Sequence, residues 1–148
     1  MKTKKKRKSK SVSDSTLRKY WKLAVIEHYG MVCQICGKEH EALDCHHIVH
    51  RKKRVLRWHW FNGVPVCRDG CHNFADTLAG RDEIRFKIGE DRYAFLKENE
   101  NILYKDYLFK NKATDNEFRE FELKKLKRIL GGYDIITEKE FHKFINKE

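Results

Sequence analysis

The chain contains no long apolar segment. Nowhere in its 148 residues does an apolar run approach the ~18 residues that span a membrane, which excludes a transmembrane protein. The first ten residues are charged and lead into polar ones, so the start does not resemble a signal peptide. Repeats of fixed period are also absent, and the length predicts one domain with an attached tail or extension. Because 37% of the residues are charged, the hydrophobic core is expected to be thin, and a bound metal would help it to fold.

Cysteine is scarce, but its placement is informative. Four of the five cysteines form two close pairs, Cys33/Cys36 and Cys67/Cys71. With no signal peptide in view, we expect a cytoplasmic protein whose cysteines are reduced metal ligands and not disulfides. Gaps of two and three residues let both thiolates of a turn face one ion, so the pairs predict a closed, structural Zn²⁺ site. Cys45 lies outside the pairs and is expected to be buried in a strand.

Basic residues outnumber acidic ones, giving a formal net charge of +11. Most of the excess lies in the first 32 residues, which hold ten lysines and arginines against only Asp14 and Glu27. A second basic group lies in a loop and comprises Arg51, Lys52, Lys53, Arg54 and Arg57. A polyanionic partner is indicated, DNA or RNA in preference to a membrane. The alternatives are a solvated tail for the first group and an ordinary solvated loop for the second.

The hydrophobic pattern predicts an α+β fold that begins with a helix. Residues 1–13 lack periodicity and are predicted to form a disordered basic arm. A helix is expected over about 15–29, because apolar residues recur there at intervals of three and four. Asp14 or Ser15 can cap its start and Gly30 can end it.

Two short strands and a helix are predicted next, as a ββα unit. The strands are expected at 42–49 and 64–67, and the helix near Gly70 or Cys71. The first strand carries the two adjacent histidines that are discussed below.

The remainder of the chain is predicted to be helical. Residues 81–98 complete a domain that spans 14–98, and residues 99–148 form a C-terminal helical extension. Capping boxes mark helix starts at Thr114 and Thr137. The aromatic faces of these helices favour packing in a core, with a homodimer as the alternative.

His46 and His47 stand between the cysteine pairs and are not needed to hold a structural zinc. Neighbouring strand residues point to opposite faces, so one imidazole can bind a metal while the other meets a different part of a substrate. Imidazole ligates divalent ions, and its pKa near ~6.5 makes it a usable general base. A base and a divalent ion together provide what phosphodiester hydrolysis requires. The pair therefore marks a candidate active site, with Asp44 on the same strand face as His46.

This arrangement resembles the HNH nucleases of the His-Me-finger (ββα-metal) group. The resemblance covers about residues 33–76, and it rests on the cysteine pairs, His46-His47-Ile48, the Asn62 segment Phe61-Asn62-Gly63-Val64-Pro65-Val66-Cys67, and His72. It implies a metal-dependent DNA endonuclease with the catalytic residues His46, His47, Asn62 and His72. By this resemblance His46 and His72 would bind the catalytic Mg²⁺ or Mn²⁺, His47 would activate water, and Asn62 would hold the loop that orients His47.

Some assignments stay open at this stage. The second cysteine pair has a gap of three where the family commonly has two, so Asn73 is the alternative to His72 as a metal ligand. The resemblance also implies that Arg51, Lys52, Lys53, Arg54 and Arg57 contact DNA phosphates. Trp58 and Trp60 either stack on unpaired bases or pack beneath the loop.

A looser resemblance points to phage recombination nucleases of the NinG/Rap type. It rests on Arg51, on Val55-Leu56-Arg57-Trp58 and on residues 83–90, and it implies branched DNA as a substrate in a bacterial or phage-infected cell. The main alternative is a non-catalytic zinc-knuckle protein that binds nucleic acid, and a phage accessory protein is a third reading.

Overall fold

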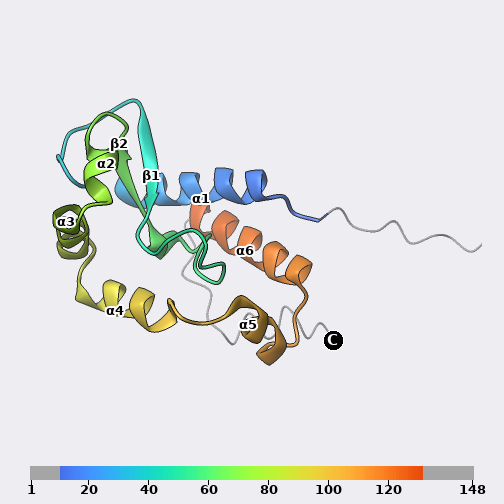
Figure 1. Ribbon diagram of the computed structural model, residues 1–148. Coiled ribbons are helices and arrows are strands. Elements are labelled where there is room, and N and C mark those ends of the chain that lie inside the picture. The colour runs from blue at the N-terminus through green and yellow to red at the C-terminus, as the bar shows by residue number, and fades with distance from the viewer. Residues whose placement is uncertain (1–10, 132–148) are drawn as a thin grey trace, which may run out of the picture.

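The structure is a computed structural model that describes residues 11–131 of the chain. Its elements are α1 (Asp14–Tyr29), β1 (Leu43–His47), the 3-10 helix η1 (Trp60–Asn62), β2 (Gly63–Cys67), α2 (Cys71–Ala75), α3 (Leu78–Ile88), α4 (Glu90–Asn99), α5 (Tyr104–Lys110) and α6 (Asp115–Leu130). The two strands form an antiparallel hairpin between α1 and α2 (Figure 1). The predicted small α+β fold is thus confirmed. None of the helices in the described range combines the length and the apolar character needed to cross a membrane.

Helix α1 begins one residue earlier than the sequence indicated. Its cap is Ser13, whose hydroxyl accepts a hydrogen bond of 3.2 Å from the backbone N–H of Thr16, so the prediction of Asp14 or Ser15 was wrong. Because the helix starts at Asp14, the capping residue is the one before it. The Asp14 carboxylate lies in the first turn, where its negative charge interacts favourably with the positive end of the helix dipole. Gly30 ends the helix as predicted.

The hairpin is short and packs closely on α1. His47 pairs with Gly63, and Asp44 pairs with Val66. Strand β1 spans Leu43–His47 and is therefore shorter at both ends than the predicted range 42–49. Gly63 is required by this packing, since a Cβ there would lie 2.5 Å from Cγ2 of Val25 and 2.6 Å from Cζ2 of Trp21. The absence of a side chain therefore sets how closely the strand that follows η1 approaches α1.

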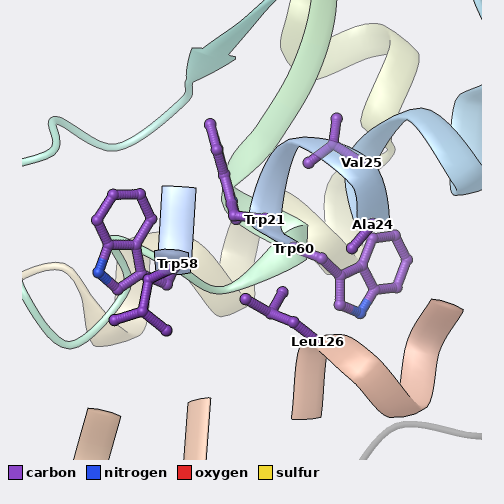
Figure 2. Close-up of a cluster of buried hydrophobic side chains, with 7 residues drawn as sticks. Trp21, Ala24, Val25, Trp58, Trp60 and Leu126 are labelled. Atoms are coloured by element: carbon purple, nitrogen blue, oxygen red, sulfur yellow. The ribbon is translucent and has the colours of Figure 1, made fainter. Parts of the chain in front are cut away.

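The main core cluster joins α1 to α6 (Figure 2). Its buried members are Leu17, Trp21, Ala24, Val25, Trp58, Trp60 and Leu126. Trp58 and Trp60 are only 6% and 8% exposed, so they pack beneath the loop and do not offer open faces for stacking on bases. Leu126 reaches this cluster from the segment that was expected to be an extension. Helices α1 and α6 run side by side in Figure 1.

The later helices largely follow the sequence pattern. Gly89 separates α3 from α4, and Ile84 and Leu96 are buried as predicted. The capping box of Thr114 and Glu117 begins α6. The second predicted capping box and most of the basic arm lie outside the described residues.

Candidate functional site

The four paired cysteines lie together at one end of the hairpin. Cys33 and Cys36 come from the turn after α1, Cys67 ends β2, and Cys71 begins α2. Their sulfur atoms all lie within 4.8 Å of one another, which confirms the predicted cluster and is consistent with a zinc site. Gly70 makes the three-residue gap possible, because its φ of 90° lies in the left-handed region that glycine adopts without strain.

The thiols of this cluster have unequal acidities. Burial by itself would raise the pKa of Cys33, but hydrogen bonds from the backbone of Cys36, Cys67 and Ile35 lower this pKa to about 7. Burial and the neighbouring sulfurs raise the pKa of Cys71. One cysteine therefore ionises readily, and its negative charge opposes ionisation of the other three. A bound divalent cation would neutralise this charge and favour the thiolate form of all four.

Strand β1 presents two different faces to the helices beside it. Asp44 and His46 face α2, where the Asp44 carboxylate accepts a 2.9 Å hydrogen bond from Nδ1 of His72. Cys45 and His47 face α1, and the imidazole of His47 stacks on the indole of Trp21 with ring centroids 4.1 Å apart. The adjacent histidines thus have separate surroundings, as the strand period requires.

His47 is held by a backbone carbonyl. Its Nε2 lies 2.9 Å from the carbonyl oxygen of Arg57, and since that oxygen only accepts, Nε2 carries the hydrogen. The other nitrogen, Nδ1, then has the lone pair. Burial lowers the pKa of His47 to about 4. The hydrogen bond to Arg57 acts in the opposite direction, and the charges of His46, Arg57 and Arg51 make smaller contributions that lower the pKa. The ring is therefore neutral at physiological pH and has one basic nitrogen.

Asn62 fixes the loop that carries this carbonyl. Its side chain is fully buried, and Oδ1 accepts a 2.6 Å hydrogen bond from the N–H of Val49. Nδ2 donates to the carbonyl oxygens of Val49, at 3.0 Å, and of Leu56, at 3.2 Å. Leu56 directly precedes Arg57, so the amide of Asn62 determines where the carbonyl that holds His47 lies.

Arg92 of α4 supports the segment around Asn62, and its role was not predicted from the sequence. Its guanidinium donates to the carbonyl oxygens of Phe61, at 2.7 Å, and of Gly63, at 3.1 Å, on either side of Asn62. It also donates to the hydroxyl of Tyr29. No spacing signal marks this role, because the partners are backbone oxygens about thirty residues away in the chain.

A second group of possible metal ligands lies between β1 and α2. Nδ1 of His46 is 3.9 Å from a carboxylate oxygen of Asp76, and the rings of His46 and His72 have centroids 6.1 Å apart. Because Nδ1 of His72 donates to Asp44, its Nε2 has the free lone pair. Over residues 11–131, however, the four cysteines alone form a group of three or more ligand atoms within 4.8 Å.

Helix α2 distinguishes His72 from its alternative. His72 and Asp76, one helical turn apart, line the same hollow as His46, whereas Asn73 is exposed and does not line it. Asp76 was missed in the sequence, although its i, i+4 spacing from His72 could have indicated it. Burial alone would raise the pKa of Asp44, but hydrogen bonds from Arg68 and His72 hold it below its usual range.

The hollow in front of the histidines has a volume of about 790 Å³. It is lined by Asp14, Arg18, Trp21, Lys22, Asp44, Cys45, His46, His47, His50, Arg51, Arg57, Trp58, His72 and Asp76. The predicted DNA-binding residues divide into three groups. Arg51 and Arg57 line the hollow, Lys52 and Lys53 are exposed beside it, and Arg54 instead pairs with Asp115 at 2.9 Å.

Comparison of the chain with models of known families, with curated proteins and with solved structures found no match.

Proposed function

We propose that the chain is a metal-dependent DNA endonuclease with the ββα-metal fold of the HNH nucleases. The observation that carries the proposal is the setting of His47. Its imidazole is neutral, it donates Nε2–H to the carbonyl oxygen of Arg57, and it lies with three further histidines at a hollow lined by four basic residues. A core histidine with only a packing role would not need a hydrogen-bonded loop and an open hollow in front of it.

In this proposal His47 acts as the general base. Nδ1 accepts a proton from water as the water oxygen attacks phosphorus, the bond between phosphorus and the 3′ oxygen breaks, and that oxygen takes a proton from solvent. The carbonyl of Arg57 keeps the ring oriented and stabilises the imidazolium that forms. The products carry 5′-phosphate and 3′-hydroxyl ends, as the resemblance to HNH nucleases implies.

His46 and His72 would hold the catalytic ion, with Asp76 as a further ligand. Bound there, a divalent ion would neutralise charge on the phosphate and stabilise the leaving oxygen. Mg²⁺ and Mn²⁺ are the proposed ions, and two imidazoles in the donor set also suit Ni²⁺, Co²⁺ or Zn²⁺. The four-cysteine zinc would be structural and take no part in the reaction.

Nicking of supercoiled plasmid by the wild type and by His47→Ala tests this function. The substitution should lower the rate by about 10²–10⁴-fold, the usual contribution of a general base. Added imidazole should restore part of the activity, because a free base can occupy the space that the side chain vacates. Unchanged nicking by His47→Ala would exclude this mechanism, and loss of nicking without rescue would point to a structural role.

The same assay with linear, nicked, flapped and four-way DNA under several divalent ions would define the substrate. Preference for flapped or four-way DNA would support action on branched recombination intermediates, for which the looser NinG/Rap resemblance is the only support. Equal cleavage of all four would indicate a general duplex nuclease.

One observation favours a second candidate, a zinc-knuckle protein that binds nucleic acid without cutting it. The His46 group is more open than the cysteine cluster, whose four sulfurs all lie within 4.8 Å of one another. Metal analysis separates the candidates, since the binding protein needs one zinc per chain and the nuclease needs a second divalent ion that His46→Ala should remove.

A further inference from the structure

Helix α1 forms one wall of the hollow, and its exposed cations are not explained by the fold. Arg18 and Lys22 are exposed, lie one helical turn apart and both line the hollow. Trp21 lies between them in sequence and carries the stacking contact with His47. The backbone carbonyl of Lys22 also lies 3.9 Å from Sγ of Cys45 in β1. The two cations therefore stand at the edge of the hollow next to the histidine.

The charge on this wall is not neutralised within the described part of the chain. Neither Arg18 nor Lys22 forms an ion pair with any residue between 11 and 131. Two of the three carboxylates of the hollow pair with other cations, and the third, Asp76, lies 3.9 Å from Nδ1 of His46. Asp14 pairs with Arg119 at 2.7 Å, and Asp44 pairs with Arg68 at 3.0 Å.

The loop after β1 brings fewer available cations to the hollow than the sequence indicated. Arg54 pairs with Asp115 and stacks over the ring of Tyr104, with 4.0 Å from Cζ to the centroid. Arg57 donates to the carbonyl of Arg51 at 2.6 Å and lies 3.8 Å from Asp14. Arg51 is then the exposed cation of the loop that lines the hollow together with Arg18 and Lys22.

We propose that Arg18 and Lys22 of α1 bind the phosphate backbone of DNA and, with Arg51 of the loop, hold the strand at the histidines. Cations on two walls fit a polyanion with evenly spaced charges, and such contacts position a strand without reading its sequence. The inference deepens the proposed nuclease function and rests on it for the identity of the polyanion.

The test compares two double variants that each remove two positive charges. The wall variant, Arg18→Ala/Lys22→Ala, removes the two cations by which α1 lines the hollow. The control, Lys19→Ala/Lys110→Ala, removes two exposed lysines that do not line the hollow. Binding of a fluorescent DNA duplex is measured by anisotropy over a range of salt concentrations, without added Mg²⁺ or Mn²⁺. The wall variant should bind about 10–60-fold more weakly near 0.1 M salt, with a log–log salt slope lower by about 1.8. The control should change both much less.

Equal weakening by both double variants, an unchanged salt slope in the wall variant, or no DNA binding by the wild type would overturn the inference. Urea unfolding should give the same midpoint for the wall variant and the wild type, and a large fall would assign the two residues to stability instead. Cleavage is scored separately. If the wild type binds DNA through Arg18 and Lys22 but does not cut it, the nuclease function is refuted and the binding surface is supported. If the protein cuts DNA and the double variant binds DNA as well as the wild type, the binding surface is refuted and the nuclease function is supported.

Discussion

Asn62 forms a two-way pair of hydrogen bonds with the backbone of Val49. Its Oδ1 accepts from the Val49 N–H at 2.6 Å, and its Nδ2 donates to the Val49 carbonyl oxygen at 3.0 Å. The same amide reaches the carbonyl of Leu56, one residue before the carbonyl that holds His47. A single buried side chain thereby joins the turn before β2 to the loop after β1.

Asn62→Ala should therefore destabilise the protein and impair cleavage. The substitution removes the Asn62 partner of the Val49 N–H and carbonyl, and it removes one donor from the Leu56 carbonyl, which keeps its bond from the N–H of His59. The loss should cost about 2–4 kcal/mol. Urea unfolding should show the loss of stability, and nicking should also fall at temperatures where the variant is folded. Asn99→Ala, at an exposed helix end, is the control and should change neither. A folded Asn62→Ala with full activity would contradict the role given to the loop.

Replacing one ligand of the cysteine cluster should unfold the core. Cys36→Ser should reduce the zinc content well below one per chain and abolish the cooperative thermal transition, because the binding energy of a structural zinc is folding energy. Zinc is measured by elemental analysis and the transition by circular dichroism. Cys45→Ser is the matched control, since Cys45 lies outside the cluster, and it should retain one zinc. A native-like melt of zinc-free Cys36→Ser would rule out a structural zinc.

Removing the guanidinium of Arg92 should loosen η1. Arg92→Met keeps much of the apolar side chain but leaves the carbonyls of Phe61 and Gly63 without this donor, which should cost about 2–4 kcal/mol. Arg85→Met is the control, because Arg85 makes an exposed ion pair with Glu90, and such pairs are worth about 0–1 kcal/mol. Chemical unfolding of both variants makes the comparison. Similar losses in the two would show that Arg92 contributes no more than a surface residue.

A methyl group at Gly63 should force the hairpin away from α1. Gly63→Ala brings a Cβ within 2.5 Å of Cγ2 of Val25, and overpacking of this kind costs about 1–3 kcal/mol. Val25→Ala removes the nearer of the two clashing atoms and leaves Cζ2 of Trp21 at 2.6 Å. In a double-mutant cycle of unfolding free energies, the double variant should therefore lose less stability than the two single variants together. Simple additivity would show that the clash is relieved elsewhere.

The unfolding free energy should fall as the pH drops below about 6.5, partly because of His59. Its Nδ1 accepts from the N–H of Phe61 at 3.2 Å. Burial, and then the charges of Lys125 and Arg92, lowers the pKa of His59 well below its ordinary value of 6.5. Below 6.5 the unfolded chain binds a proton at this position that the native state does not bind. The stabilisation is therefore present above that pH and is lost as the pH falls.

His59→Asn isolates this contribution. The amide oxygen of the new asparagine can accept from the Phe61 N–H, but the amide does not titrate. The dependence of the unfolding free energy on pH should therefore be less steep in the variant than in the wild type, by up to about 1.4 kcal/mol per pH unit. The slope is measured by urea unfolding between about pH 5 and pH 6.5. An identical slope in the variant and the wild type would show that the imidazole of His59 takes up its proton without unfolding.

Local spacing was sufficient for several features of the fold. The two cysteine gaps predicted a cluster that the structure confirms, and the capping box at Thr114 marked the start of α6. The adjacent histidines of β1 face different helices, as strand alternation requires. The signals for these features come from residues within a few positions of one another, where covalent geometry and backbone hydrogen bonding leave few arrangements. The meeting of the two cysteine pairs is itself a tertiary contact.

Only the tertiary structure decided which distant groups meet. It turned Trp58 and Trp60 into the core, paired Arg54 with Asp115, and packed Leu126 of α6 beneath α1. It also brought His72, and not Asn73, to the hollow, and it gathered Arg18, Lys22 and Arg51 at that same hollow. Such contacts join residues tens of positions apart, and they depend on how the whole chain closes around its apolar side chains. The local sequence therefore determined which chemical groups the site contains. Tertiary packing determined which residues line the hollow and which hydrogen bonds hold the site in place.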